Sequence, residues 1–223
     1  MLSVVIPTLE AAPSLAATVE SLGGAPFPLE IVVTDGGSVD ATCEVASDLG
    51  AVVVGAPRGR GIQLAAGAFV AKGEWLLFLH ADTRLGKGWA EVAAEFMAVP
   101  GNESRAGVFR FALDDRTPAA RRIERMVAWR CRRLGLPYGD QGLLMTRTFY
   151  DTLGGFRPLS LFEDVEMVRR IGRDRLTFLD VPAVTSAARY RRDGYLARPL
   201  RNLLCLGLYF MGVPPRRIAR IYG

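Results

Sequence analysis

Cysteine, histidine and lysine are scarce in this sequence, and their scarcity excludes several kinds of site. The 223 residues include three widely separated cysteines and a single histidine, His80. These residues cannot form a structural zinc site of the cysteine and histidine type within the chain. A Ser-His-Asp mechanism is excluded unless His80 is its base. The odd number of sparse cysteines favours a reducing compartment.

Long apolar segments and leader signals are also missing. The segment 3–7 reads as a strand and lacks the basic residues that open a signal peptide. The apolar run 203–213 spans eleven residues, which is too few to cross a bilayer. We therefore expect a cytoplasmic protein without a transmembrane span, either free or peripheral on the inner face of the membrane.

The chain has enough apolar residues to fill a core, since 50% of them are hydrophobic. This composition excludes a disordered or fibrous chain. No internal repeat and no low-complexity linker divides the sequence. We expect one continuous domain over residues 1–190 and an amphipathic helical tail over residues 191–223.

Positive charge is carried almost entirely by arginine and by the second half of the chain. Lys72 and Lys87 are the only lysines. Residues 1–104 hold five basic and twelve acidic side chains, a net charge of −7, whereas residues 105–223 hold 23 and 11, a net charge of +12. Such an asymmetry predicts an anionic partner for the second half, either nucleic acid, a phosphate-bearing substrate or an anionic membrane.

Short apolar runs alternate with helical patterns in the first half of the chain. Strands are predicted at 2–6, 30–34, 51–54 and 75–79, and helices at 14–22, 40–49 and 62–71. This alternation predicts an α/β fold with a mostly parallel central sheet flanked by helices, as in Rossmann-like nucleotide-binding folds. In such sheets ligands bind beyond the carboxyl ends of the strands.

The second half is less regular. Strands are predicted at 106–113, 142–146 and 176–181, and helices at 118–134 and 165–171. Helix 118–134 carries an apolar stripe of Ile123, Met126, Val127 and Cys131 among arginines. Such a stripe, like the apolar side chains of the tail, usually packs in the core or in a homodimer interface. The alternative is that these surfaces lie on an anionic membrane.

Two loops after predicted strands have the chemistry of a nucleotide site. Asp35 ends a strand and can accept hydrogen bonds from a nucleobase or a ribose, while Gly37 lets the backbone approach a ligand. Arg58 and Arg60 flank a glycine before a helix whose first turn contains Gln63, an arrangement suited to a diphosphate. The alternatives are a turn capped by Ser38 and a solvated basic loop.

Two further acidic segments suggest a metal ion and a general base. Asp82 follows an apolar strand, with His80 two residues earlier, and the pair could hold Mn²⁺ or Mg²⁺ against phosphate oxygens. The alternative is a structural histidine and an aspartate that begins a turn. Glu163 and Asp164 open a predicted helix, where the helix dipole alone favours acids. Held there, either carboxylate can serve as a general base.

In this order and at these separations, the loops resemble those of a family-2 glycosyltransferase with the GT-A fold. The segments 5–10, 35–40 and 80–82 are similar to the family's opening strand, nucleoside and Asp-x-Asp motifs, although Gly36 and His80 replace aspartates. Glu163 and Asp164 match the family's Glu-Asp pair. The resemblance covers about the first 190 residues and includes a Gly-Asp-Gln-Gly segment at 139–142.

The resemblance implies an inverting transfer from a UDP- or GDP-linked sugar to a hydroxyl acceptor, assisted by Mn²⁺ or Mg²⁺. Residues 1–104 would bind the donor and residues 105–190 the acceptor. Together with the basic charge, the resemblance implies an anionic or lipid-linked acceptor and no nucleic-acid partner. The implied site residues are Asp164 and Glu163 for catalysis, Asp82 and His80 for metal, Asp140 and Gln141 for the acceptor, and Pro7, Thr8, Glu10, Asp35, Gly37, Arg58, Arg60, Gln63 and Ala81 for the donor.

Two other functions are compatible with parts of the sequence. A nucleotidyltransferase of related architecture usually has a glycine-rich, lysine-bearing loop after its first strand, whereas this chain has Thr8, Leu9 and Glu10 there. A catalytically degenerate nucleotide-sugar-binding protein is the second alternative, because Gly36 and His80 depart from the family motifs.

Overall fold

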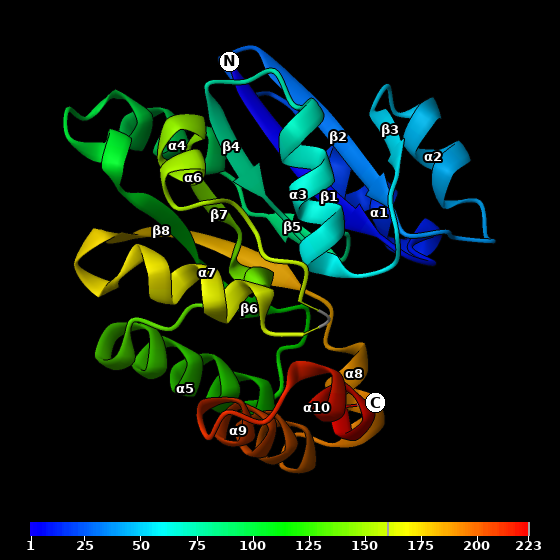
Figure 1. Cartoon of the computed structure of the whole chain (residues 1–223), viewed down its shortest axis with the longest axis vertical. Helices are drawn as coiled ribbons and strands as arrows, with labels where there is room; N and C mark the ends of the chain where they lie inside the picture. Colours follow the sequence, from blue (N-terminus) through cyan, green and yellow to red (C-terminus); the bar gives the residue numbers. More distant parts are fainter. Residues whose placement is uncertain (160, 223) are drawn as a thin grey trace.

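A single sheet runs through the molecule and carries helices on both faces (Figure 1). The structure, a computed structural model, describes residues 1–159 and 161–222. Within these residues the sheet has eight strands in the order β3-β2-β1-β4-β7-β6-β8-β5. The strands are β1 (Leu2–Thr8), β2 (Leu29–Asp35), β3 (Val52–Gly55), β4 (Trp75–Phe78), β5 (Thr83–Leu85), β6 (Ala106–Leu113), β7 (Leu143–Thr146) and β8 (Leu176–Thr185).

The α-helices connect these strands and form the C-terminal segment. They are α1 (Ala12–Glu20), α2 (Thr42–Asp48), α3 (Arg60–Val70), α4 (Trp89–Ala98), α5 (Pro118–Leu134), α6 (Arg147–Thr152), α7 (Glu163–Ile171), α8 (Ala188–Asp193), α9 (Ala197–Phe210) and α10 (Pro215–Tyr222). The expected α/β fold with a mostly parallel sheet is confirmed.

The first four strands of the sheet order, β3, β2, β1 and β4, are parallel to one another. Their register places Thr8 beside Asp35, and Asp35 beside Gly55. The ends of these strands therefore lie at one edge of the sheet. β7 runs antiparallel to both β4 and β6, and β8 returns parallel to β6.

The side chains of β1 alternate between the two faces of the sheet, and helices cover both faces. Leu2, Val4 and Ile6 point to one face, where they join a core cluster with residues of α1, α2 and α4. Val5 points to the other face and packs with residues of α3, α6 and α7. A strand buried on both sides reads as a continuous apolar run, as this one does.

Helical and strand periodicity predicted most elements but missed β5, α6 and the ten-residue α4. Strand 106–113 and helix 118–134 have the predicted bounds. β5 was missed because its three residues are stabilised by pairing with the distant β8. Of the predicted apolar stripe, Ile123, Val127 and Cys131 are buried in the core, whereas Met126 is 49% exposed.

The C-terminal helices pack on the segment that precedes α7. Cys205 and Leu206 of α9 and Ile218 of α10 form a buried cluster with residues 161, 162 and 165. The expected boundary at residue 190 falls inside α8. Within the part of the chain that the structure describes, no helix is both long enough and apolar enough to cross a membrane.

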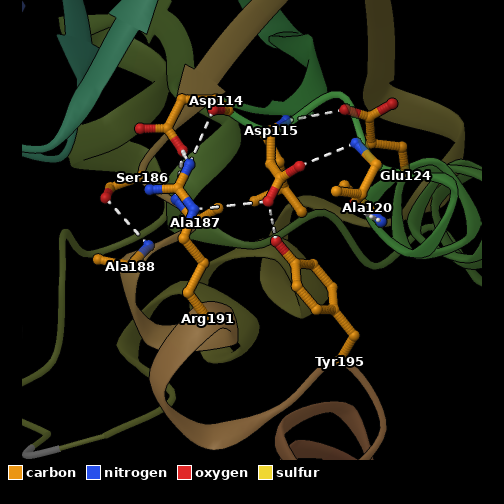
Figure 2. Close-up of polar contacts among 11 residues, drawn as sticks. Asp114, Asp115, Ala120, Glu124, Ser186, Ala187, Ala188, Arg191 and Tyr195 are labelled. Atoms are coloured by element: carbon orange, nitrogen blue, oxygen red, sulfur yellow. Dashed lines mark hydrogen bonds and ion pairs between the residues drawn. The ribbon is translucent and has the colours of Figure 1, made fainter.

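A polar cluster fastens α8 and the start of the tail to the end of β6 (Figure 2). Asp114 accepts hydrogen bonds from the Ala187 amide at 2.7 Å and from Arg191 at 2.9 Å. Asp115 accepts hydrogen bonds from Arg191 at 3.5 Å and from the hydroxyl of Tyr195. The hydrogen bond from Tyr195 is the main reason that the pKa of Asp115 falls from 3.8 to about 2.

This cluster should make the fold sensitive to acid. The pKa of Asp115 is lower in the folded chain than its reference value, so its ionised form stabilises the fold above about pH 4. That contribution is lost as the pH falls from about 4 towards 2. Tyr195→Phe should therefore lower the free energy of unfolding in urea at pH 7, and the deficit should shrink at pH 3. Tyr209→Phe is the control, and an equal deficit at both pH values for Tyr195→Phe would contradict the assignment.

Candidate active site

Asp35 organises the loop that follows β2. Its buried carboxylate accepts hydrogen bonds from the Thr8 hydroxyl at 3.0 Å, the Gly37 amide at 2.9 Å and the Ser38 amide at 2.7 Å. Burial raises its pKa, but these hydrogen bonds, with one from the Ser38 hydroxyl, hold the pKa below its usual value. Asp35 thus brings a fixed negative charge to the edge of the sheet. Ser38 does not cap α2.

Glu10 joins the loop after β1 to this same loop. Its carboxylate accepts a hydrogen bond from the Val39 amide at 2.8 Å, and its own amide donates to the Ser38 hydroxyl at 2.9 Å. Glu10 has a φ of 52°, and left-handed residues other than glycine are uncommon. Pro7 pairs with Thr34 in the sheet register. The structure therefore brings together the residues of the loops after β1 and β2 that are predicted to bind the sugar donor.

Gln63 ties the ends of β1 and β2 to α3. Its side-chain amide donates to the carbonyl oxygens of Thr8 at 2.6 Å and Thr34 at 2.8 Å, and its oxygen accepts from the Gly59 amide at 3.3 Å. With 3% of its surface exposed, Gln63 faces the protein interior. Arg58, by contrast, is exposed at the surface.

Arg60, the first residue of α3, lies between Glu163 and His80. Its Nε is 3.3 Å from Glu163 Oε1, and its Nη1 is 3.4 Å from His80 Nε2. Burial, opposed by Arg60 and reinforced by Asp164, raises the pKa of Glu163 to about 7. Burial and then the charges of Arg60 and Arg189 lower the pKa of His80 well below its usual value. His80 is therefore neutral at physiological pH, and its Nε2 can accept from Arg60.

Asp164 lies in the first turn of α7 and contacts a turn from another part of the chain. Its Oδ2 accepts a hydrogen bond from the Gly139 amide at 2.7 Å, and its Oδ1 accepts from the Val165 amide at 2.7 Å. A Cβ at position 139 would lie 2.6 Å from His80 Nε2 and 3.4 Å from Asp164 Oδ2. Only glycine fits here without displacing His80, so Gly139 allows the two side chains to approach the same turn.

Phe162, directly before α7, is held in a left-handed conformation by the tail. It has a φ of 65°, a conformation that costs about 1–3 kcal/mol and persists where the surroundings enforce it. Its ring packs on Tyr209 of α9 with centroids 4.9 Å apart. The tail therefore helps to set the position of Glu163 and Asp164.

Asp140 and Gln141 lie in the short turn Gly139–Gln141 but face different surroundings. Asp140 Oδ1 is shielded from solvent and has no hydrogen-bond partner in the described part of the chain. Burial, opposed by Arg130 and reinforced by Asp164 and Asp82, raises the pKa of Asp140 to about 7. Gln141 is buried and donates to the Phe109 carbonyl at 3.0 Å, so its side chain supports the sheet.

A cavity of about 500 Å³ opens beside these residues, between α5, α9 and the edge of the sheet. We name it the α5–α9 cavity. One end of it, the predicted catalytic end, is lined by Arg60, His80, Asp82, Arg130, Asp140 and Asp164. The rest of its wall is mostly apolar and comes from α5, α9 and the segment before α7.

The structure separates the predicted residues into two groups. Asp82, Asp140 and Asp164 all line the cavity. Glu163 does not line it: this residue is 1% exposed and pairs with Arg60. Ala81 contributes a carbonyl that accepts a hydrogen bond from Thr18 at 2.9 Å. No three histidine, cysteine, aspartate or glutamate side chains in residues 1–159 and 161–222 form a ready-made metal cluster.

Arg130, Tyr138 and Phe162 are among the lining residues that sequence reasoning did not assign to the site. The guanidinium group of Arg130 lies over the ring of Tyr138, 3.4 Å from its centroid. Helical spacing could have found Arg130, because it lies three residues after Val127 and four before Leu134 on the predicted helix. Nothing local marks Tyr138 or Phe162, since both depend on contacts between distant segments.

A parallel sheet with polar loops at the carboxyl ends of its strands is typical of α/β nucleotide-binding proteins. Within that class the family is shown by sequence. The model of glycosyl transferase family 2 matches residues 3–193, and the chain belongs to this family. It is therefore a family-2 glycosyltransferase, as the resemblance of its motifs implied. No curated protein sequence matches the chain.

Solved glycosyltransferase structures share this fold at low sequence identity. Residues 1–349 of S. aureus TarS match with a TM-score of 0.64 and 15% identity, over 99% of this chain and 69% of that one. Glucosyl-3-phosphoglycerate synthase from Mycobacterium tuberculosis, in complex with Mn²⁺, UDP and glucosyl-3-phosphoglycerate, matches with a TM-score of 0.67 and 17% identity, over 96% and 81%. A mannosyltransferase from Pyrobaculum calidifontis, in complex with GDP-Man and Mn²⁺, matches with a TM-score of 0.61 and 19% identity, over 90% and 59%. The GT-A fold is thereby confirmed.

Proposed function

We propose that this protein transfers a sugar from a UDP- or GDP-linked donor to a hydroxyl acceptor, with inversion and with Asp164 as the general base. The observation that carries the proposal is that Asp164 lies in the same cavity wall as Asp82 and Arg60, beside the carboxyl edge of β1 to β4. A donor in the loops and an acceptor in the cavity would meet at Asp164.

The donor would lie over the first half of the sheet. Pro7, Thr8 and Glu10 at the end of β1 would form one side of the donor site, and Asp35 and Gly37 would contact the nucleoside. Arg58 and Arg60 supply positive charge for a diphosphate near the start of α3. Gln63 would position the donor loops through its hydrogen bonds to β1 and β2, and Glu163 would position Arg60 through their ion pair. UDP and GDP-Man are present in the similar solved structures, which supports a nucleotide-linked sugar here.

The chemical step is a single in-line displacement at the anomeric carbon. Asp164 takes the proton of the acceptor hydroxyl, whose oxygen forms the new glycosidic bond as the bond to the diphosphate breaks. Burial raises the pKa values of Asp140 and Glu163 to about 7, which favours their neutral forms more than in an exposed carboxylate.

The carboxylates in the cavity fit a divalent metal ion. Mg²⁺ at phosphate sites is usually held by one or two carboxylates together with the phosphates of the substrate, so a three-ligand protein cluster is not needed. Asp82 lies in the cavity wall, and Asp140 Oδ1 there lacks a partner within the described residues. We assign Asp82 to the metal, because the ring of His80 already contacts Arg60. When bound, Mn²⁺ or Mg²⁺ would neutralise the charge of the leaving diphosphate.

Donor hydrolysis tests this function. UDP- and GDP-linked sugars are incubated with the protein, with Mn²⁺ or with EDTA, and the released nucleotide is measured. Metal-dependent release of nucleoside diphosphate is the expected result. Release of pyrophosphate from a nucleoside triphosphate and a sugar phosphate would instead indicate a nucleotidyltransferase. Donor binding by thermal shift without any turnover would indicate a degenerate binding protein.

The environment in which this reaction takes place is part of the proposal. All three cysteines, Cys43, Cys131 and Cys205, are free thiols. Free thiols support the expected reducing, cytoplasmic location. Peripheral contact with a membrane and homodimer formation remain predictions.

A further inference from the structure

We propose that the α5–α9 cavity binds the hydrocarbon part of an alcohol acceptor and places its hydroxyl group at Asp164. This inference rests on the function proposed above and names the substrate class of the same site. It excludes sugars, phosphates and other wholly polar acceptors as the preferred partner.

Beyond the charged residues at the catalytic end, most of the cavity wall is apolar. Apolar residues come from β6, α5, the segment before α7, α7 itself and α9: Phe111, Ile123, Val127, Leu161, Val165 and Leu206. Against this apolar part of the wall, an acceptor made only of hydroxyl or phosphate groups would lose water without gaining partners. A hydrocarbon chain gains free energy from the same burial.

The outer part of the same wall presents apolar side chains to water. Leu200 and Leu203 of α9 are 68% and 64% exposed, and Trp129 and Leu134 of α5 are 57% and 52% exposed. All four line the cavity. Both helices also bury residues that do not line the cavity, Ala120 and Cys131 on α5 and Cys205 on α9. Each helix therefore presents further apolar side chains to one cavity. The two helices lie at the same end of the molecule (Figure 1).

The size and continuity of the cavity favour a small amphiphile over a second protein. Its volume of about 500 Å³ is within the range of about 300–1,000 Å³ typical of small-molecule sites. The apolar wall and Asp164 belong to one cavity, so an occupant that fills the wall has one end beside the base. A partner protein lying across α5 and α9 would not account for this continuity.

The charges at the catalytic end favour a neutral hydroxyl over a phosphate. Three carboxylates, those of Asp82, Asp140 and Asp164, line this end. Four arginines also line the cavity: Arg60 pairs with Glu163, Arg198 pairs with Asp193, Arg130 donates to the Leu136 carbonyl, and Arg189 is exposed on α8. A phosphate placed at Asp164 itself would meet the like charge of that carboxylate and would bring no alcohol proton for the base to take, whereas a neutral alcohol does bring one.

A series of straight-chain alcohols tests the proposal with a binding measurement. Tryptophan fluorescence, to which Trp129 in the cavity wall contributes, is titrated with 1-hexanol, 1-octanol and 1-decanol. Affinity should rise by up to about fourfold for each added CH₂ group, the factor expected for complete burial of that group. The matched probes are glycerol and decyl phosphate. Affinity independent of chain length, or tighter binding of decyl phosphate than of 1-decanol, would overturn the proposal.

Two variants locate the effect. Leu203→Glu places a charge in the cavity wall and should remove the dependence on chain length. Phe69→Glu is the matched control, because Phe69 is 88% exposed on α3 and does not line the cavity. It should bind alcohols like the unmodified protein. Equal weakening in both variants would mean that the alcohols bind elsewhere or nonspecifically, and thermal unfolding checks that both are folded.

Turnover separates this inference from the proposed function. With a donor that the protein hydrolyses, 1-decanol should yield a decyl glycoside, and glycerol should yield at least tenfold less product. If the donor is hydrolysed but alcohols neither bind nor react, the acceptor class is wrong and the transferase function stands. If alcohols bind in the cavity but no donor is turned over, the function is wrong and the cavity assignment stands.

Discussion

Replacing Asp164 by asparagine should lower the rate of sugar transfer by about 10²–10⁴-fold, the contribution typical of a general base. The donor should bind the variant within a few-fold of its affinity for the unmodified protein. The reason is geometric: Asp164 lies in the wall of the α5–α9 cavity, while the donor loops are held by Asp35, Glu10 and Gln63. Asparagine keeps an oxygen that can accept from the Gly139 amide but cannot take up the acceptor's proton.

The measurement for this variant is initial transfer rate together with donor affinity by calorimetry. Asp174→Asn is the control, because Asp174 is an exposed aspartate just beyond α7 and should leave both quantities unchanged. Loss of donor affinity in Asp164→Asn would show that this residue binds the donor and is not the base. Retention of full transfer activity would show that another group accepts the proton.

Replacing Asp82 by asparagine should abolish the effect of the metal on donor binding. In the presence of Mn²⁺ the affinity for the nucleoside diphosphate should fall by at least about a hundredfold, because metal neutralisation of phosphate charge is worth several kcal/mol. With EDTA, the variant and the unmodified protein should bind the nucleotide about equally. The physical basis is that Asp82 is a carboxylate in the cavity wall, on the side of the parallel strands.

Calorimetry with UDP and GDP, each with Mn²⁺ and with EDTA, measures this effect. Asp48→Asn is the matched control, because Asp48 is an exposed aspartate of α2. If Asp82→Asn retains the full difference between Mn²⁺ and EDTA, Asp82 is not the ligand. His80→Gln in the same assay then tests the second predicted ligand, whose ring contacts Arg60 in the structure.

The arginine-rich composition has a partly structural explanation. The net charge of +12 beyond residue 104 predicts an anionic partner, yet several of these arginines donate to backbone carbonyls of the protein itself. Arg147 donates to the carbonyls of residues 68, 71 and 73, and Arg170 donates to those of residues 153 and 155. Others form ion pairs, such as Arg191 with Asp114. The net charge of a sequence therefore includes arginines whose side chains are already bound to other groups of the folded protein.

The sequence by itself determined the parallel half of the sheet and the types of residue that follow its strands. Apolar runs and helical repeats are local signals, so β1 to β4 and their loops could be found before any contact was known. The motif order led to the family, and Asp35, Arg60, Asp82 and Asp164 were named as site residues from their place after strands and before helices. Their roles in donor, metal and acceptor chemistry remain predictions.

Only the tertiary structure decided which of these side chains face a common cavity. Glu163 and Asp164 are neighbours in sequence, yet one lies behind Arg60 and the other in the cavity wall, because successive residues of a helix point in different directions. Gln63 and Gln141 turn inward to backbone carbonyls. The apolar wall joins α5 to α9, segments more than 60 residues apart. No local pattern records such a contact, since it exists only when distant helices pack around the same space.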